Sequence, residues 1–452
     1  MRLKYLLPVL LAAGLSSAAL ANPYETTLKN GLRIIVKEDH RAPTAVQMVW
    51  YRIGSTDEVD GASGVAHVLE HMMFKGTPNV GPGEFNKRVA AAGGRDNAFT
   101  SRDYTAYFQQ VPTEKLEDVM QLEADRMRHL TVDAKEFEQE IKVVMEERRM
   151  RTDDNPQAKL FEQMNAVAFQ AHPYRRPIIG WMNDLETMTA ADAKAWYDTW
   201  YVPNNAYVVI TGDVDHKAVF ALAEKYYGPL EGRALPARRQ QIEPAQEGTR
   251  RVNVKAPAEL PVLIMGYKAP ILRDIDKDSD PYALQMLAAI LDGHDAARFN
   301  KKLVREDKVA LSAGIDYDNT ARGPGMLYLH GSPSEGRTVA ELEAALRAEI
   351  ARIQQAGVSA AELKRAKAQL LASEVYKLDS MFGQAMEIGQ IEAVGLPYEK
   401  LDRMLEKLQK VSAADVQAVA KKYFNDDALS VGVLEPQPLD GKPRRAASPG
   451  RH

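Results

Sequence analysis

The stretch HVLEHMMFKGT, His67–Thr77, carries the most specific chemical pattern in the chain. On a helix, residues four positions apart lie on one face with Cβ atoms about 5–6 Å apart, so the imidazoles of His67 and His71 can converge on one metal ion. Glu70 flanks the same face, where its carboxylate can reach a water on the ion rather than the ion itself. The pattern predicts a zinc site with Glu70 as general base for a zinc-bound water. The alternative interpretation is two surface histidines on an amphipathic helix.

A catalytic zinc site usually has three protein ligands, so these histidines leave one ligand to be found. The nearest acid-rich helical pattern covers 134–150, where Glu140 and Glu147 are seven residues apart and return to one face after two turns. Glu147 is a candidate third ligand, and Glu140 is a candidate second-layer support. The alternative is a solvated helix face, because basic residues lie nearby. Spacing alone does not separate Glu147 from three other acids, which are Glu123, Glu136 and Glu138.

Further out along the chain, β-type runs and amphipathic helical patterns are mixed. Strands are expected at 32–36, 46–51, 100–110 and 206–212, and then at 262–267, 310–317, 326–330 and 428–434. Helices are expected at 64–74, 83–92, 113–129 and 134–150, and then at 281–291, 339–355 and 360–375. The strands do not alternate regularly with helices, which favours an α+β fold over a doubly wound sheet.

The 452 residues are too many for one ordinary core, so two domains are expected. A stretch rich in Gly, Pro, Gln and charged residues separates two halves that both mix strands and helices and both end on a strand after a helix. The predicted divisions are a signal peptide at 1–21, an N-terminal domain at 22–230, a linker at 231–251, a C-terminal domain at 252–435 and a disordered tail at 436–452.

The first residues have the three parts of a secretory signal peptide. Arg2 and Lys4 precede the apolar run Tyr5–Leu15, and an Ala-Leu-Ala sequence ends at Ala21. The alternative is a membrane anchor, but the apolar run is short for a span of about 20 residues. We expect cleavage after Ala21, a mature chain with no membrane span, and a periplasmic or secreted location.

Composition narrows the chemistry that the mature chain can use. There is no cysteine, so disulfides and thiolate metal sites are excluded, and any metal must be held by histidines and carboxylates. The 58 basic and 62 acidic side chains give a formal charge of −4, which disfavours a nucleic-acid partner.

HVLEHMMFKGT also resembles the inverted zinc motif of the pitrilysin/insulinase-type metallopeptidases, which include mitochondrial processing peptidase. The resemblance continues at Gly93–Phe108, His172–Gly180 and Trp200–Asp215. In that family the third zinc ligand is a Glu 76 residues after the second histidine, and that position here is Glu147. A supporting acid seven residues earlier is also usual in the family, and Glu140 matches it.

The resemblance implies a half-length chain of two similar α+β domains, each a largely antiparallel sheet packed by helices. Two such chains enclose a chamber in which peptides bind by adding a strand to a sheet edge. Asn97, Ala98 and Phe99 match the family's edge strand and are therefore expected to contact substrate. The implied cofactor is one Zn²⁺ per chain, and the implied activity is that of a zinc metalloendopeptidase.

The second half departs from the active members of the family. They carry an Arg and a Tyr seven residues apart, and the matching positions here are Val304 and Leu311. Arg298, Arg305 and Tyr317 lie nearby but out of register. We therefore expect a homologous partner subunit that supplies the missing pair, in a heterodimer, with a homodimer as the alternative.

Three hypotheses follow for the function. The leading one is an exported zinc metalloendopeptidase that hydrolyses peptides or unfolded segments. The second is a non-catalytic peptide-binding or assembly subunit of the same fold, which the missing pair favours and the intact zinc motif opposes. The third is a zinc scavenger that carries the ion as cargo.

Overall fold

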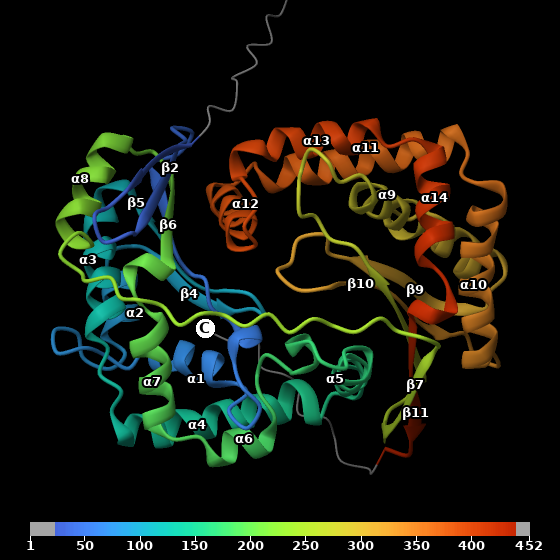
Figure 1. Ribbon diagram of the computed structural model, residues 1–452, viewed down its shortest axis with the longest axis horizontal. Coiled ribbons are helices and arrows are strands. Elements are labelled where there is room, and N and C mark those ends of the chain that lie inside the picture. The colour runs from blue at the N-terminus through green and yellow to red at the C-terminus, as the bar shows by residue number, and fades with distance from the viewer. Residues whose placement is uncertain (1–22, 440–452) are drawn as a thin grey trace, which may run out of the picture.

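The computed structural model describes residues 23–439. The predicted signal peptide, and the predicted tail from residue 440 onward, lie outside the described residues. Within 23–439 no helix is both long and apolar enough to cross a membrane. Two sheets face each other across the molecule, with helices around them (Figure 1).

The first sheet is built from the first half of the chain. Its strand order is β1-β2-β6-β3-β5-β4, and every pair is antiparallel except β2 with β6. The strands are β1 (Tyr24–Thr27), β2 (Arg33–Glu38), β3 (Thr44–Tyr51), β4 (Arg95–Thr100), β5 (Thr105–Pro112) and β6 (Ala206–Gly212). β4 is therefore an edge strand, joined to β5 by a short turn.

The second sheet repeats this plan. Its order is β7-β11-β8-β10-β9, and only β7 and β11 are parallel. The strands are β7 (Arg250–Pro257), β8 (Val262–Ala269), β9 (Ala310–Tyr317), β10 (Gly325–Pro333) and β11 (Leu429–Gln437). The α+β prediction of two similar, largely antiparallel sheets packed by helices is confirmed.

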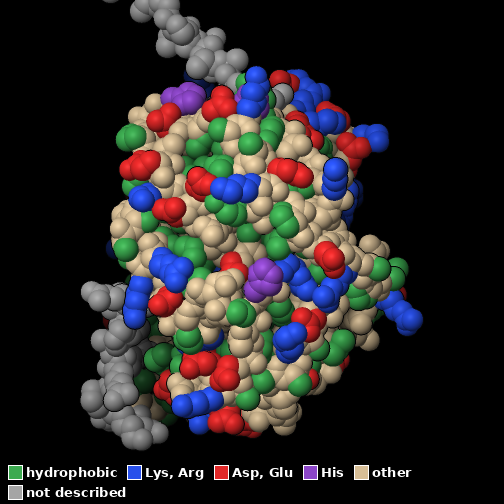
Figure 2. Space-filling view, turned by 90° about the vertical axis from the view of Figure 1, so that its left-hand side faces the viewer, with side chains coloured by type: hydrophobic (Ala, Val, Ile, Leu, Met, Phe, Trp, Pro, Cys, Tyr) green, Lys and Arg blue, Asp and Glu red, His purple; other side chains and the backbone are tan. Residues whose placement is uncertain are grey.

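Helices cover the outer faces of both sheets. Those of the first half are α1 (Val65–Met72), α2 (Glu84–Ala91), α3 (Leu116–His129), α4 (Ala134–Arg148), α6 (Met182–Thr187), α7 (Ala190–Trp200) and α8 (His216–Tyr226). Those of the second half are α9 (Asp280–Asp292), α10 (Val339–Ala356), α11 (Ala360–Lys377), α13 (Leu401–Lys410) and α14 (Ala413–Tyr423). The surface drawn in Figure 2 intersperses basic and acidic side chains, in keeping with the small net charge.

Two further helices pack against the sheet of the opposite half. α12 (Met381–Ala393) lies on β3 and β6, and α5 (Pro156–Ala168) lies on β7 and β11 (Figure 1). This explains why β3 is apolar on both faces. Val49 packs with the outer helices, whereas Trp50 packs into the core that α12 shares.

Several elements differ from their sequence-based prediction. The strand expected at 100–110 covers the last residue of β4, the turn at Ser101–Tyr104 and most of β5, and the rest of β4 was not predicted. β11 continues past Leu434 to Gln437, pairing with β7, so the first residues of the predicted tail are strand. β1, β7 and several helices, including α5 and α12, were not predicted.

Candidate metal centre

The helix that carries both histidines, α1, begins at a tightly fixed point. Gly64 has φ +89°, and a Cβ there would lie 2.6 Å from the carbonyl oxygen of Ile179, so only glycine fits. The buried Glu58 accepts hydrogen bonds from the N–H groups of Gly64 at 2.9 Å and Ala66 at 3.0 Å. A carboxylate at a helix N-terminus satisfies otherwise unpaired donors there. Glu58 thus fixes the start of the helix that bears the site.

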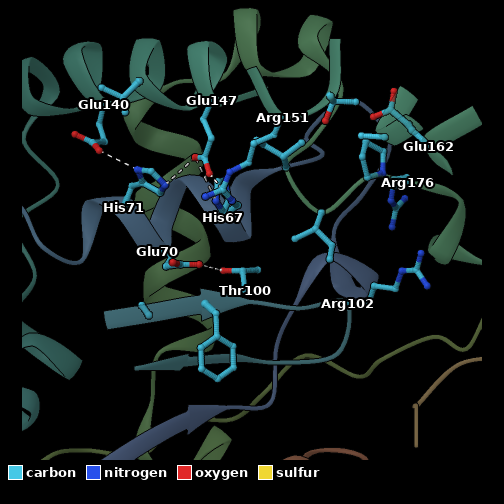
Figure 3. A pocket seen from close by; sticks show the side chains of 18 of the residues that line it. His67, Glu70, His71, Thr100, Arg102, Glu140, Glu147, Arg151, Glu162 and Arg176 are labelled. Carbon is cyan, nitrogen blue, oxygen red and sulfur yellow. Dashed lines mark hydrogen bonds and ion pairs between the residues drawn. The ribbon is translucent and has the colours of Figure 1, made fainter. Parts of the chain in front are cut away.

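His67 and His71 lie one helical turn apart on α1, and their ring centroids are 4.8 Å apart. α4 crosses α1 and brings Glu147 to both rings (Figure 3). Glu147 Oε2 lies 3.7 Å from His67 Nε2 and 3.4 Å from His71 Nε2. The three side chains are only 9–12% exposed. The structure therefore brings together the three residues that the sequence analysis nominated as ligands.

Glu140 lies on α4 two turns before Glu147 and supports this arrangement. Glu140 Oε1 lies 2.9 Å from His71 Nδ1, and the other carboxylate oxygen pairs with Lys75. A proton on Nδ1 leaves Nε2, the atom facing Glu147, with its lone pair for a metal. Glu140 is therefore placed to hold His71 in one orientation and one tautomer.

The competing acids lie elsewhere. Glu123 is fully buried and bonds to Arg126 and to Gln109, in the core under α3. Glu136 and Glu138 lie on the first turn and a half of α4 and are outside the lining of the cavity described below. Sequence spacing could not make this distinction, because it depends on where α4 crosses α1.

Glu70, on the same helix, also lines the cavity that the three residues share and points toward Thr100 (Figure 3). It accepts a hydrogen bond from the hydroxyl of Thr100, at the end of β4. Burial raises the pKa of Glu70, and the bond from Thr100 opposes that rise. A carboxylate whose pKa is raised toward neutrality is better suited to accept and return a proton. Thr100 was not nominated from the sequence, since nothing in its spacing connects β4 with α1.

These residues line a cavity of about 760 Å³. Asn97, Ala98 and Phe99 of β4 line its wall, so the nominated substrate residues and the nominated ligands face one space. Within the described residues, no strand pairs with the outer edge of β4. Arg151 also lines the cavity and lies 2.7 Å from Glu147 Oε1. The sequence could have indicated Arg151 by its position four residues after Glu147, because residues at this spacing are neighbours on a helix.

The donor set fits a zinc ion. Glu147 Oε2 is buried and makes no hydrogen bond among the described residues, yet it faces two imidazole nitrogens. Ligands at about 2.0–2.2 Å around a tetrahedral ion lie about 3.4 Å from one another, close to the spacings found here. Two imidazoles and one carboxylate would leave a fourth position open, as catalytic zinc sites do.

Comparison with known proteins agrees with this geometry. The family model described as insulinase, peptidase family M16, matches residues 33–181, which include α1 and α4. A zinc protease of Helicobacter pylori, PqqE, is 30% identical over 443 residues, covering 96% of this chain and 98% of the relative. The chain belongs to the M16 peptidase family. A second model, described as the peptidase M16 inactive domain, matches residues 187–370 of this M16 chain.

Two solved protease structures share the fold of this chain, one over its whole length and the other over about half of its length. The crystal structure of a protease from Helicobacter pylori has a TM-score of 0.87 at 29% identity and covers 92% of this chain and 100% of that one. The periplasmic protease PqqL from Escherichia coli has a TM-score of 0.79 at 20% identity and covers 92% of this chain but 48% of its own. This M16 chain thus corresponds to about half of PqqL in fold.

Among the described residues of its second half, the M16 chain places no cation–phenol pair in the cavity beside His67, His71 and Glu147. Val304 packs against the second core, and Leu311 on β9 is 57% exposed. Arg298 is paired with Glu362, and the hydroxyl of Tyr317 donates to the carbonyl of Pro270. None of these residues is among those that line the cavity in the described part of the chain.

Proposed function

We propose that this chain is a zinc-dependent endopeptidase that cleaves peptides or unfolded segments. The observation that carries the proposal is one cavity faced by three metal-type donors, by Glu70 and by an open strand edge. Each of these features has a separate task in peptide hydrolysis: holding the ion, moving the proton and holding the substrate backbone.

His67, His71 and Glu147 would hold the ion, which when bound supplies Lewis acidity to the carbonyl and makes a water more acidic. Glu70 would take the proton of the attacking water and return it to the nitrogen of the leaving amine. The hydroxyl of Thr100 would keep the Glu70 carboxylate turned toward the cavity.

Substrate would add a strand to β4 beside Asn97, Ala98 and Phe99. Backbone pairing at a sheet edge reads an extended main chain and is largely indifferent to side chains. A second cavity of about 650 Å³ shares Arg102 and Phe161 with the first and is lined by both halves of the chain. The two cavities would accept a peptide longer than the segment that pairs with β4, which suits unfolded segments.

A homologous partner subunit would complete the site. The family resemblance places Val304 and Leu311 at the positions where active members have an Arg and a Tyr, and PqqL is about twice as long as this chain. A heterodimer in which the partner supplies the pair is the preferred assembly. The signal-peptide pattern at 1–21 supports export, with activity in the periplasm or outside the cell.

The test is a Glu70→Gln variant of residues 22–452, assayed by mass spectrometry on a mixture of unstructured peptides. The amide cannot take a proton, so cleavage is expected to fall at least 100-fold with zinc content unchanged. Glu146→Gln is the matched control, because Glu146 is an exposed neighbour of Glu147 paired only with Arg149. Equal cleavage by wild type and Glu70→Gln would overturn the mechanism.

The non-catalytic alternative predicts a different result. A peptide-binding subunit would bind peptides and show no cleavage, even when loaded with zinc and mixed with a homologous chain that carries the Arg–Tyr pair. Chelator-sensitive cleavage that Glu70→Gln abolishes would exclude this alternative.

A further inference from the structure

A second group of metal-type side chains lies at the end of the first sheet, away from the zinc cavity. Glu38 ends β2, Asp213 and Asp215 follow β6, and His216 begins α8, while His40 follows β2 in the next turn. The described lining of the zinc cavity includes none of them. Figure 2 shows histidine and acidic side chains together near the upper edge of the first half.

Three of these side chains already converge. One ligating atom each from Glu38, Asp215 and His216 lies within 4.8 Å of the other two. The carboxylate of Glu38 joins the two histidines, since Oε1 is 2.8 Å from His216 Nδ1 and Oε2 is 3.9 Å from His40 Nε2. Ligands of a tetrahedral ion are about 3.4 Å apart, and the two distances from Glu38 to the imidazole rings lie on either side of that value. His40 and Asp215 are exposed, and Asp215 also caps α8 by accepting a hydrogen bond from the N–H of Ala218 at 2.9 Å.

The orientation of His40 is set by a carboxylate. His40 Nδ1 lies 2.6 Å from Asp213 Oδ1, which turns Nε2 toward Glu38. His71 and Glu140 show the same relation at the zinc cavity. Carboxylate partners of this kind fix the tautomer and raise the basicity of a metal-bound imidazole.

The orientation of His216 is set by packing. Its ring stacks on Tyr24 with centroids 3.6 Å apart and meets the edge of Phe220 at 5.8 Å. Its backbone N–H donates to Glu38 Oε1 at 2.9 Å. A ring held in this way loses little conformational entropy when it binds an ion, so the site is preorganised.

We propose that Glu38, His40, Asp215 and His216 form a second divalent metal site of the zinc class, with Asp213 as the support of His40. Two imidazoles and two carboxylates are a donor set that Zn²⁺ accepts with tetrahedral geometry. The bound ion would join the ends of β2 and β6 to the start of α8 and, through the ring stacked on His216, to β1. It would stabilise the folded chain by mass action, and it takes no part in peptide hydrolysis.

The test is calorimetric titration of metal-free residues 22–452 with ZnCl₂. The wild-type chain is expected to bind two equivalents, and His40→Ala/His216→Ala is expected to bind one and to keep its peptidase activity. His67→Ala/His71→Ala is expected to bind one equivalent and to lose activity. The retained site in each variant reports that the variant is folded.

His129→Ala is the matched control. His129 is an exposed histidine whose Nδ1 lies 3.0 Å from Asp125, and within residues 23–439 it belongs to no group of three metal-type side chains. The control is expected to bind two equivalents like wild type. The proposal is overturned if His40→Ala/His216→Ala binds as many equivalents as wild type, whatever the wild-type number is. Because the readout is stoichiometry, failure here leaves the proposed peptidase function standing.

Discussion

A Glu140→Gln variant tests whether Glu140, which supports His71 but is not itself a ligand, affects metal affinity. Glu140→Gln removes the charge that holds His71 Nδ1–H and frees Lys75. Loss of such a partner usually costs about 10–100-fold in metal affinity. We therefore expect zinc to be lost to a competing chelator at correspondingly lower chelator concentration, with activity largely restored by excess zinc. Glu136→Gln, one turn earlier on α4, is the control, and an unchanged affinity in Glu140→Gln would contradict the assignment.

Glu58 gives a prediction for the pH dependence of stability. Burial raises its pKa to about 8, against about 4.5 in the unfolded chain. Between these values the folded state keeps a proton that the unfolded state releases, so the free energy of unfolding falls as pH rises, by up to about 1.4 kcal/mol per unit. Glu58→Gln cannot titrate, so its urea-unfolding free energy is expected to fall less between pH 5.5 and 8. Parallel curves for wild type and variant would refute this.

At the scale of single residues, the sequence predicted those site residues that lie close together along the chain. His67, Glu70 and His71 lie on one helix, and helix geometry alone nominates them. Glu147 was selected by family resemblance, because its approach depends on the crossing of α1 and α4. Thr100 was not found, because its contact with Glu70 joins a strand to a helix that is distant along the chain.

At the scale of elements, the absence of a side chain at Gly389 allows α12 to pack closely on the first sheet. A Cβ on Gly389 would lie 2.1–2.5 Å from the ring of Trp50. Gly389→Ala is expected to lower the free energy of unfolding by about 1–3 kcal/mol through overpacking. This sign opposes helix propensity, which favours alanine by roughly 0.5–1 kcal/mol. Chemical denaturation would measure the change, and Trp50→Phe should reduce it in a double-mutant cycle. A stabilised Gly389→Ala chain would show that α12 does not pack as described.

The same helix shows why part of the fold could not be predicted. Periodicity predicted most strands of the two sheets and many of the helices, since a buried face imposes its repeat on the sequence. Periodicity did not indicate that α5 and α12 each cover the sheet of the other half. An amphipathic pattern shows that one face of a helix is buried but not which element it packs against. The turn between β4 and β5 was also missed, since 100–110 is rich in Thr, Tyr and Phe and was predicted as one strand.

At the scale of the whole molecule, the assembly predicts how activity depends on a partner. The chain alone is expected to cleave unstructured peptides slowly, and a homologous chain with the Arg–Tyr pair is expected to raise kcat/KM at least 10-fold, because each missing hydrogen bond to substrate weakens positioning. Gel filtration of the mixture would show whether a heterodimer forms. Full activity in a strictly monomeric fraction would contradict the requirement for a partner.

A contact between the two halves of the chain holds the end of the edge strand β4. Arg322, in the β9–β10 connection, donates to both carboxylate oxygens of Asp57 at 3.0 and 2.9 Å and to the carbonyl of Asp103 at 3.0 Å. Its backbone N–H donates to Asp103 Oδ2, which also accepts from Tyr174. Asp103 lies in the β4–β5 turn, so the second half holds the end of the edge strand that carries Thr100.

Arg322→Ala should therefore change both stability and substrate binding. Loss of bonds to a buried carboxylate costs about 2 kcal/mol, and Arg238, 3.2 Å from Asp57, limits the loss. The released β4–β5 turn makes the strand edge less ordered before substrate binds, so KM is expected to rise more than kcat falls. Arg337→Ala is the control, because Arg337 forms only an exposed pair with Glu341 on α10, worth at most about 0.5 kcal/mol. A variant destabilised to the expected extent but with an unchanged KM would show that the contact joins the halves without positioning β4.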